Sequence, residues 1–320
     1  MKRFLFASMI AAVCVAGVFA TGQGETKASA KVRIAIVPVA LNNPIFLDAI
    51  EASKKAGAEL GVEILPTASA NPDAAEQVKV IEGLIEQKVD GILLFPVDSK
   101  ALKGVVDKAI DKGIVVGILN SDIPDSKRPF YAGTDNYTLG KTCGELMVKL
   151  MGGKGKVVVQ TGVIGMAALD ERVQGFRDVI KGTAIEEVAF QANDDNMEKA
   201  VELINTFLSA HPEVDGYFVD GGWPFFAPPA SLPELVKFRA RGGIYGTVDT
   251  FYPMFKYLDR PDPLADFMIG QDYSAMGDYG TRTILKLIKG GTVDQKIFYT
   301  PLEYVTKDNF KEVLARKKAW

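Results

Sequence analysis

Short apolar runs alternate with amphipathic segments almost without interruption after residue 30. An apolar run of four to eight residues is typical of a strand buried on both faces of a sheet, whereas apolar residues three and four positions apart are typical of a covering helix. Strands separated by such helices predict parallel sheets with helices on both faces. The expected strands cover residues 32–39, 62–65, 91–95, 115–119, 130–133, 156–160, 187–191, 216–219, 243–248 and 266–270.

Helix-starting signals follow several of these strands. In LNNPIF, Asn43 suits an N-cap and Pro44 suits the first helical position, because the missing N–H of proline would have no partner there. The apolar spacing that follows stops at Gly61, which predicts the helix end. Asn-Pro also opens the helix expected over residues 71–89, and another helix is expected over 196–212.

The alternation of strands and helices falls into two series. The second series begins at Lys156, after the glycine-rich turn GGKGK. One sheet of ten strands would be unusually wide, and two lobes of about a hundred residues or more fit the usual size of a domain better. The sequence therefore predicts an α/β fold with two Rossmann-like lobes, each built on a parallel sheet.

The first thirty residues differ from the rest of the chain. MKR is followed by an apolar run and by Val18-Phe19-Ala20, which resembles a signal-peptidase site, so residues 1–20 are expected to be a secretory signal peptide and 21–30 a flexible leader. Lipid attachment at Cys14 is a less favoured alternative, because Val13 stands where a lipid-attachment box has a small residue. We expect an exported protein.

Composition removes several classes of function. The chain has 320 residues and a formal net charge of −3, with no basic run, so a nucleic-acid partner is not expected. Cys143 lies in a helical pattern and is expected to be a buried apolar group, and His211 is expected in a loop. Neither residue belongs to a metal-ligand pattern, and no phosphate-binding loop is present. We therefore expect no metal, no cofactor and no enzymatic activity.

Polar clusters directly follow several of the expected strands. Each alone could be a turn or a helix cap, because Asn, Asp and Gly favour such places. Their recurrence at the carboxyl ends of parallel strands predicts a shared binding site. Carboxylates and amides hydrogen-bond hydroxyl groups, and aromatic faces pack on the C–H faces of a sugar or polyol. The candidates are Asn43, Asn120, Asp122, Asp170, Asp249 and Gln271, with Phe46, Phe95 and Trp223 as aromatic faces.

Beyond residue 30 the chain resembles the type I periplasmic sugar-binding proteins of the ribose-binding family, the substrate-binding components of bacterial ABC importers. The resemblance implies a periplasmic monomer that binds a sugar or polyol between its lobes and delivers it to a membrane permease. It rests on the order and spacing of LNNPIF, ILLFPVDS (92–99), NSDIPDSKRPFYAGTDN (120–136), ALDERVQGF (168–176), GTVDT (246–250) and IGQDY (269–273).

The resemblance also implies roles for individual residues. Asn43 and Phe46 would be contacts from the first lobe, and Phe95 lies near a family contact. Asn120 stands where the family often has Asp, with Asp122 close by. Asp249 and Gln271 match hydrogen-bonding positions of the family directly, and Trp223 is placed to stack on a sugar ring or to pack on its own lobe.

Two departures make the predicted pocket more acidic than that of a ribose binder. Asp170 stands where ribose binders have an Arg, with Arg172 two residues later. Asp195 or a neighbour replaces an aromatic residue. Ribose itself is therefore not specified, and another pentose, a hexose or a linear polyol is equally compatible.

The family fold implies three chain crossings, near residues 134–137, 271–273 and 299–301. The N-terminal lobe would comprise residues 31–134 and 273–298, and the C-terminal lobe 138–270 and 301–320. Two alternatives share this fold. One is a receptor for chemotaxis or signalling, which would bind its ligand identically. The other is a LacI-type effector domain, against which the signal peptide argues because it stands in place of a helix-turn-helix.

Overall fold

The computed structural model describes residues 31–40, 44–69 and 72–317. Residues 1–30 form a separate unit from Lys31–Trp320. The predicted signal peptide and leader, Cys14 and Asn43 lie outside the described residues. Among the helices that the structure describes, none is long and apolar enough to cross a membrane.

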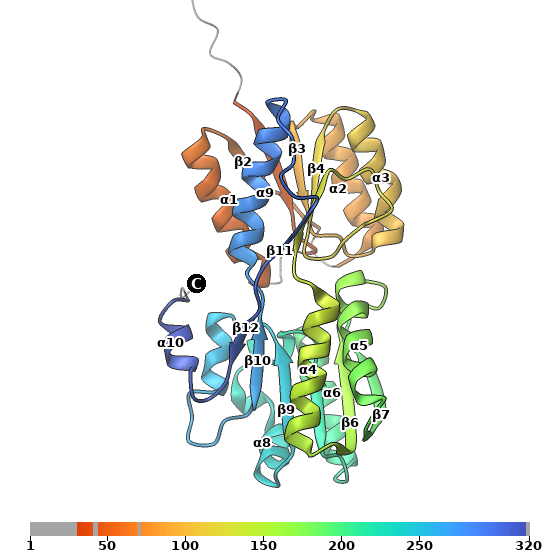
Figure 1. Ribbon diagram of the computed structural model, residues 1–320, viewed down its shortest axis with the longest axis vertical. Helices are drawn as coiled ribbons and strands as arrows, with labels where there is room; N and C mark the ends of the chain where they lie inside the picture. The colour runs from red at the N-terminus through yellow and green to blue at the C-terminus, as the bar shows by residue number, and fades with distance from the viewer. Residues whose placement is uncertain (1–30, 41–43, 70–71, 318–320) are drawn as a thin grey trace, which may run out of the picture. The chain divides into compact units, whose positions relative to one another are not determined.

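The first sheet has six parallel strands, with α1 (Leu47–Leu60) and α9 (Tyr273–Ile288) packed together on one face (Figure 1). Helices α2 (Ala74–Glu86) and α3 (Ser99–Asp111) pack together on the other face. In spatial order the strands are β11 (Ile297–Tyr299), β5 (Phe130–Gly133), β4 (Val115–Leu119), β3 (Gly91–Leu94), β1 (Arg33–Val37) and β2 (Glu63–Pro66).

The second sheet repeats this arrangement, with α4 (Asn136–Met151) against α5 (Ala167–Ile180) and α6 (Met197–Ala210) against α8 (Pro233–Ala240). Its edge strand β12 is antiparallel to β10, and the other pairs are parallel. The strand order is β12 (Glu303–Val305), β10 (Phe267–Gly270), β9 (Ile244–Val248), β8 (Gly216–Val219), β6 (Lys154–Thr161) and β7 (Ala184–Ala192).

The predicted fold class, two α/β lobes with parallel sheets, is confirmed. The chain passes from one sheet to the other three times, between β5 and α4, between β10 and α9, and between β11 and β12. All ten expected strands are present with small shifts at their ends. The short strands β11 and β12 are additional to those expected.

Helix starts differ from the expectation at two places. Pro44–Phe46 forms a 3-10 turn, and α1 starts only at Leu47. Helix α2 starts at Ala74, and the carboxylate of its N-cap, Asp73, accepts a hydrogen bond from the Glu76 N–H at 2.8 Å. Asn71, expected to open this helix, lies outside the described residues. The predicted helix end at Gly61 is confirmed: Gly61 is the C-cap of α1, with a left-handed φ of 72°.

Helices α4 and α5 approach each other so closely that only glycine fits between their backbones. A Cβ atom on Gly140 would lie 1.9 Å from the carbonyl oxygen of Arg172, and one on Gly175 would lie 2.2 Å from that of Tyr137. Cys143 is fully buried on α4, and this burial raises the pKa of its thiol. The close packing fixes the height of α5 against α4 and therefore the position of Arg172.

Candidate ligand-binding site

The strand orders define where a ligand can enter each lobe. In the first sheet the order reverses between β1 and β3, and in the second between β6 and β8. Loops that leave the carboxyl ends of strands on either side of such a reversal diverge and leave a crevice there. Phe46 and Phe95 follow β1 and β3, and Trp223 follows β8.

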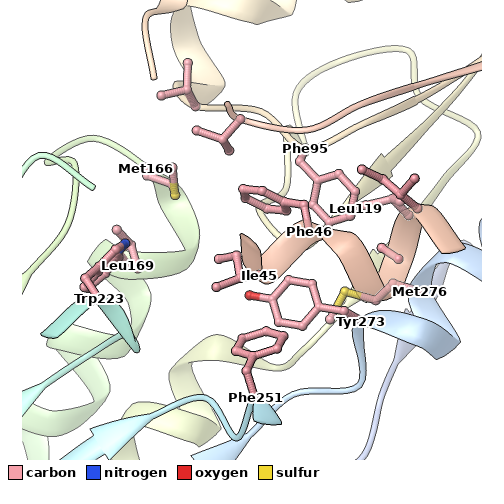
Figure 2. Close-up of a cluster of buried hydrophobic side chains, with 14 of the residues drawn as sticks. Ile45, Phe46, Phe95, Leu119, Met166, Leu169, Trp223, Phe251, Tyr273 and Met276 are labelled. Atoms are coloured by element: carbon pink, nitrogen blue, oxygen red, sulfur yellow. The ribbon is translucent and has the colours of Figure 1, made fainter. Parts of the chain in front are cut away.

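Three buried rings lie on the side of the first lobe. The ring centroids of Phe46 and Phe95 are 5.0 Å apart, and that of Tyr273 lies 6.3 and 6.4 Å from them. Figure 2 shows the Tyr273 hydroxyl turned toward the side where Trp223 and Leu169 lie. Tyr273 was not among the predicted candidates, although it stands two positions after Gln271 and close to the end of a strand.

The second lobe brings Trp223 to the same hydrophobic cluster. Trp223 is 5% exposed, and its indole N–H donates a hydrogen bond to the Asp195 carboxylate. Its ring lies over Gly162 and Gly221, where a Cβ atom would come within 2.7 and 2.4 Å of it. Leu169 of α5 belongs to the same cluster (Figure 2).

Arg172 is the centre of a buried polar network. The guanidinium donates to Asn136 Oδ1 at 2.9 Å, to the Asp220 carbonyl at 2.8 Å and to Gln271 Oε1 at 2.9 Å. Gln271 donates in turn to Asp249 Oδ1 at 2.9 Å and to the Tyr273 hydroxyl at 3.1 Å. The structure therefore joins the predicted site residues Asp249 and Gln271 directly, and Gln271 is held by an arginine whose part in the site the sequence does not reveal.

Asn120 reaches this network from the first lobe. Its carbonyl accepts hydrogen bonds from the Tyr131 hydroxyl at 2.7 Å and from Asn136 Nδ2 at 3.2 Å. Its side-chain oxygen is buried and has no hydrogen-bond partner in the described part of the chain. A buried amide oxygen without a hydrogen-bond partner costs free energy. A hydrogen bond from a ligand to this oxygen would therefore be favourable.

Asn120, Asp195 and Asp249 share an uncommon backbone conformation. Their φ angles are 63°, 58° and 77°, in the left-handed region that few residues other than glycine adopt. Such strain gathers at binding sites, where it aims side chains that a regular turn would direct elsewhere.

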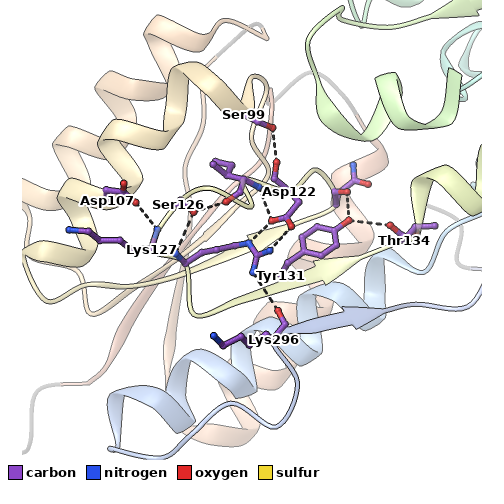
Figure 3. Close-up of polar contacts among 11 residues, drawn as sticks. Ser99, Asp107, Asp122, Ser126, Lys127, Tyr131, Thr134 and Lys296 are labelled. Carbon is purple, nitrogen blue, oxygen red and sulfur yellow. Dashed lines mark hydrogen bonds and ion pairs between the residues drawn. The ribbon is translucent and has the colours of Figure 1, made fainter. Parts of the chain in front are cut away.

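Asp122 and Asp170 are placed differently from the other candidates. Both carboxylate oxygens of Asp122 bind the Arg128 guanidinium at 2.5 Å, within the loop that joins β4 to β5 (Figure 3). Asp170 is exposed in the first turn of α5 and accepts a long hydrogen bond, 3.4 Å, from the Gly165 N–H. Ligand contact by either residue stays a prediction.

Two buried carboxylates lie beside the single guanidinium of Arg172. Burial raises the pKa of Asp220 to about 7, although Arg172 and the 2.7 Å hydrogen bond from the Thr161 hydroxyl oppose the shift. Burial also raises the pKa of Asp249, against the effects of Arg172, Gln271 and the Gly222 N–H. Both carboxyl groups therefore keep a proton more readily than an exposed aspartate does.

The described residues contain no cluster of three or more His, Cys, Asp or Glu that could hold a metal ion. His211 ends α6, where Nδ1 lies 3.1 Å from the Glu213 carboxylate and the ring stacks on Phe207.

The strand ends of the two α/β lobes supply aromatic, amide and carboxylate groups to one candidate site. This arrangement is typical of a two-lobed binding protein. The chain belongs to the periplasmic binding protein family, whose domain profile matches residues 34–292. A D-ribose/D-allose-binding protein of Pseudomonas aeruginosa is 27% identical over 297 residues, which cover 86% of this chain and 89% of that protein. The ribose import binding protein of Escherichia coli is 28% identical over 65% of this chain and 70% of its own length.

Solved structures agree with this assignment. A solute-binding protein of an ABC transporter from Burkholderia graminis, crystallised with D-arabinose, is 29% identical and superposes with a TM-score of 0.83, covering 90% of this chain and 98% of that chain. A glucose-galactose binding protein of Geobacillus stearothermophilus, 24% identical with a TM-score of 0.79 over 87% of this chain and 98% of that chain, shares the fold. These relatives are binding proteins rather than enzymes.

Proposed function

We propose that the protein binds a sugar or polyol between its two lobes and delivers it to the permease of an ABC importer. The observation that carries the proposal is that Phe46, Phe95 and Tyr273 lie on one side of a buried cluster and Trp223 on the other side (Figure 2), while Gln271, held by Arg172, donates to the Tyr273 hydroxyl. Ring faces next to amides and carboxylates match a molecule with C–H faces and many hydroxyls.

The relatives support the same ligand class. The curated proteins are named for ribose and allose, and the structure at 29% identity was obtained with arabinose. Their names include an import component and an ABC-transporter component, which favours transport over a receptor for chemotaxis or over a LacI-type repressor. We infer ligand contacts from Asn43, Phe46, Phe95, Asn120, Asp122, Asp170, Asp195, Trp223, Asp249 and Gln271.

Binding would act through the equilibrium between open and closed lobes. We infer lobes of residues 31–134 with 273–298 and of residues 138–270 with 301–320. A ligand that touches both lobes makes more contacts in the closed state and so shifts the population toward it. The permease then distinguishes loaded from empty protein by shape. No bond is made or broken. We further infer a monomer exported to the periplasm by a signal peptide at residues 1–20.

A thermal-shift screen against pentoses, hexoses, their deoxy forms and linear polyols tests the proposal. A ligand of the folded state raises the melting temperature by mass action. Asp249→Ala and Asn43→Ala should each weaken binding of the hit while the protein stays folded, because losing one partner of a buried charged hydrogen bond costs about 2–5 kcal/mol. A folded protein that no sugar or polyol stabilises would contradict the proposed function, and variants that bind like wild type would contradict the site.

A further inference from the structure

The charge balance around Arg172 points to a ligand feature beyond hydroxyl groups. Asp220 and Asp249 are 0% and 2% exposed, and neither forms an ion pair with a lysine or arginine in the part of the chain that the structure describes. An isolated buried carboxylate is costly unless a cation or a proton compensates it. Arg172 is the nearby cation, but it donates hydrogen bonds to three neutral oxygens, those of Asn136, the Asp220 backbone and Gln271.

In the described part of the chain, one side-chain oxygen of Asp220 also lacks a hydrogen-bond donor. Asp220 Oδ2 accepts from the Thr161 hydroxyl, whereas Oδ1 is buried and has no hydrogen-bond partner among the described residues. Raised pKa values for Asp220 and Asp249, caused first by burial, are the response expected of carboxylates that lack full compensation. A positive charge brought into this part of the molecule would be stabilised by both groups.

A third carboxylate and several ring faces lie next to these two. Asp195 holds the indole of Trp223, and Trp223 follows Gly222, whose N–H donates to Asp249 Oδ2 at 3.1 Å. Asp195 and Asp249 both act on the Tyr273 hydroxyl, raising its pKa after the main effect of burial. The ring of Phe251, two positions after Asp249, lies 5.4 Å from that of Tyr273. Ring faces combined with carboxylates bind ammonium groups, through cation–π attraction and charged hydrogen bonds.

We propose that the ligand is a sugar or polyol that carries an ammonium group, and that Asp249 and Asp195, which accept hydrogen bonds from Gly222 and Trp223 respectively, bind that ammonium. The inference rests on the proposed function, because it specifies the ligand class of the same site. A neutral sugar would bring no cation to Asp249, which forms no ion pair with a lysine or arginine among the described residues. An aminated ligand supplies the missing cation and retains hydroxyls for Asn120 and Gln271.

Matched ligands test this inference by isothermal titration calorimetry on the purified protein at pH 7. The probes are D-glucosamine, D-glucose and N-acetyl-D-glucosamine, the corresponding galactose series, and glucamine against sorbitol. The aminated member of at least one series should bind ten-fold or more tightly than its hydroxyl and acetylated counterparts, because acetylation keeps the nitrogen but removes its charge.

Charge-neutral variants separate selectivity from folding. Asp249→Asn and Asp195→Asn should each reduce the preference for the amine toward unity, whereas a merely structural role would weaken amine and hydroxyl ligands equally. Asp194→Asn is the matched control, since Asp194 is exposed and pairs with Lys199. It should leave the preference unchanged.

The outcomes distinguish this inference from the proposed function. Neutral members that bind as tightly as their amines, or a preference that survives in both variants, would overturn the ammonium site and leave sugar binding intact. Folded protein that binds no member of these series would overturn this inference. The proposed function would fall only if the thermal-shift screen of pentoses, hexoses, deoxy sugars and linear polyols also gave no ligand.

Discussion

Arg172 Nη2 donates to Oε1 of Gln271 at 2.9 Å, so that an arginine of α5 holds a residue at the crossing from β10 to α9. With its oxygen fixed in this way, the Gln271 amide directs its N–H groups to Asp249 and Tyr273. The same guanidinium binds Asn136, at the first turn after the crossing from β5. Arg172 therefore ties two of the three crossings to the candidate site.

Replacing Arg172 with Met should destabilise the fold strongly. Methionine fills the space but leaves Asp220 and Asp249 buried without a cation, and breaking a buried charged contact costs about 3–5 kcal/mol. The free energy of unfolding, measured by urea denaturation at pH 7, gives the size of the effect.

Arg282→Met is the matched control for that measurement. Arg282 is 44% exposed and pairs with Glu59 and Asp278 on the surface, where ion pairs contribute about 0–1 kcal/mol. Losses of equal size in the two variants would show that Arg172 has no special structural role.

Substitution of Gly140 should be far more damaging than that of another helix glycine. Gly140→Ala would drive a methyl group against the backbone of Arg172, so α4 and α5 must separate. We expect a loss of about 1–3 kcal/mol or more, as for other overpacked sites.

Gly104→Ala provides the comparison, because Gly104 lies in α3 with open space around it. There alanine should stabilise the protein by about 0.5–1 kcal/mol, through its better helix propensity. Thermal unfolding of both variants measures the difference. Equal melting temperatures would mean that the two helices do not need their close contact.

The comparison of sequence and structure shows what local pattern can predict. Ten strands were predictable because each is an apolar run several residues long. Strands β11 and β12 have three residues each, with Ile297, Tyr299 and Tyr304 at 44%, 52% and 48% exposed, so they lack the buried run that would reveal them. They form through pairing with sheets built elsewhere in the chain.

The residues of the candidate site also fall into those that the local sequence could predict and those that it could not. Asn120, Asp249 and Gln271 were predictable because they stand at the ends of strands. The role of Arg172 was not, because its partners lie 36, 48 and 99 positions away in the sequence. Nor could the pattern show that the Asp122 carboxylate is held by Arg128, since an aspartate in a loop looks the same whether it faces a ligand or an arginine.

Asp220 should make the protein less stable as the pH rises from 4 to 7. Its carboxyl has a pKa of about 7 in the fold, whereas aspartate in an unfolded chain titrates near 3.9. Between these values the folded state keeps a proton that the unfolded state has lost. Its contribution to the free energy of unfolding therefore falls with pH, by at most about 1.4 kcal/mol per pH unit, and levels off above pH 7.

Asp220→Asn should remove this dependence, because an amide resembles the protonated carboxyl and can still accept from the Thr161 hydroxyl. Melting temperatures of variant and wild type should thus diverge in favour of the variant as the pH rises from 5 to 7, and the difference should level off above pH 7. Asp259→Asn, at an exposed position, should follow wild type throughout. A constant difference between Asp220→Asn and wild type would mean that Asp220 is already ionised at pH 5.

Ser121 caps a helix of the other lobe. Helix α5 has Met166 at its N-cap position and no side-chain hydrogen bond from it, and the free Ala168 N–H instead donates to Ser121 Oγ at 3.2 Å. Ser121 follows β4 of the first sheet, so this cap exists only while the lobes are together. A lost N-cap costs about 1 kcal/mol, which corresponds to roughly five-fold in the closing equilibrium and hence in affinity.

Ser121→Ala should therefore bind ligand about five-fold more weakly, mainly because the ligand is released faster. The melting temperature of the ligand-free protein should change little. Ser121→Thr keeps the hydroxyl and should restore most of the affinity. Ser126→Ala is the control within the same loop, because its hydroxyl donates to Ile123 of its own lobe at 2.7 Å (Figure 3). Stopped-flow fluorescence measures the rate of ligand release from Ser121→Ala, Ser121→Thr and Ser126→Ala. If Ser121→Ala released ligand no faster than Ser126→Ala, the hydrogen bond between the lobes would contribute nothing to closure, and the network of Arg172 would have to hold the lobes together without it.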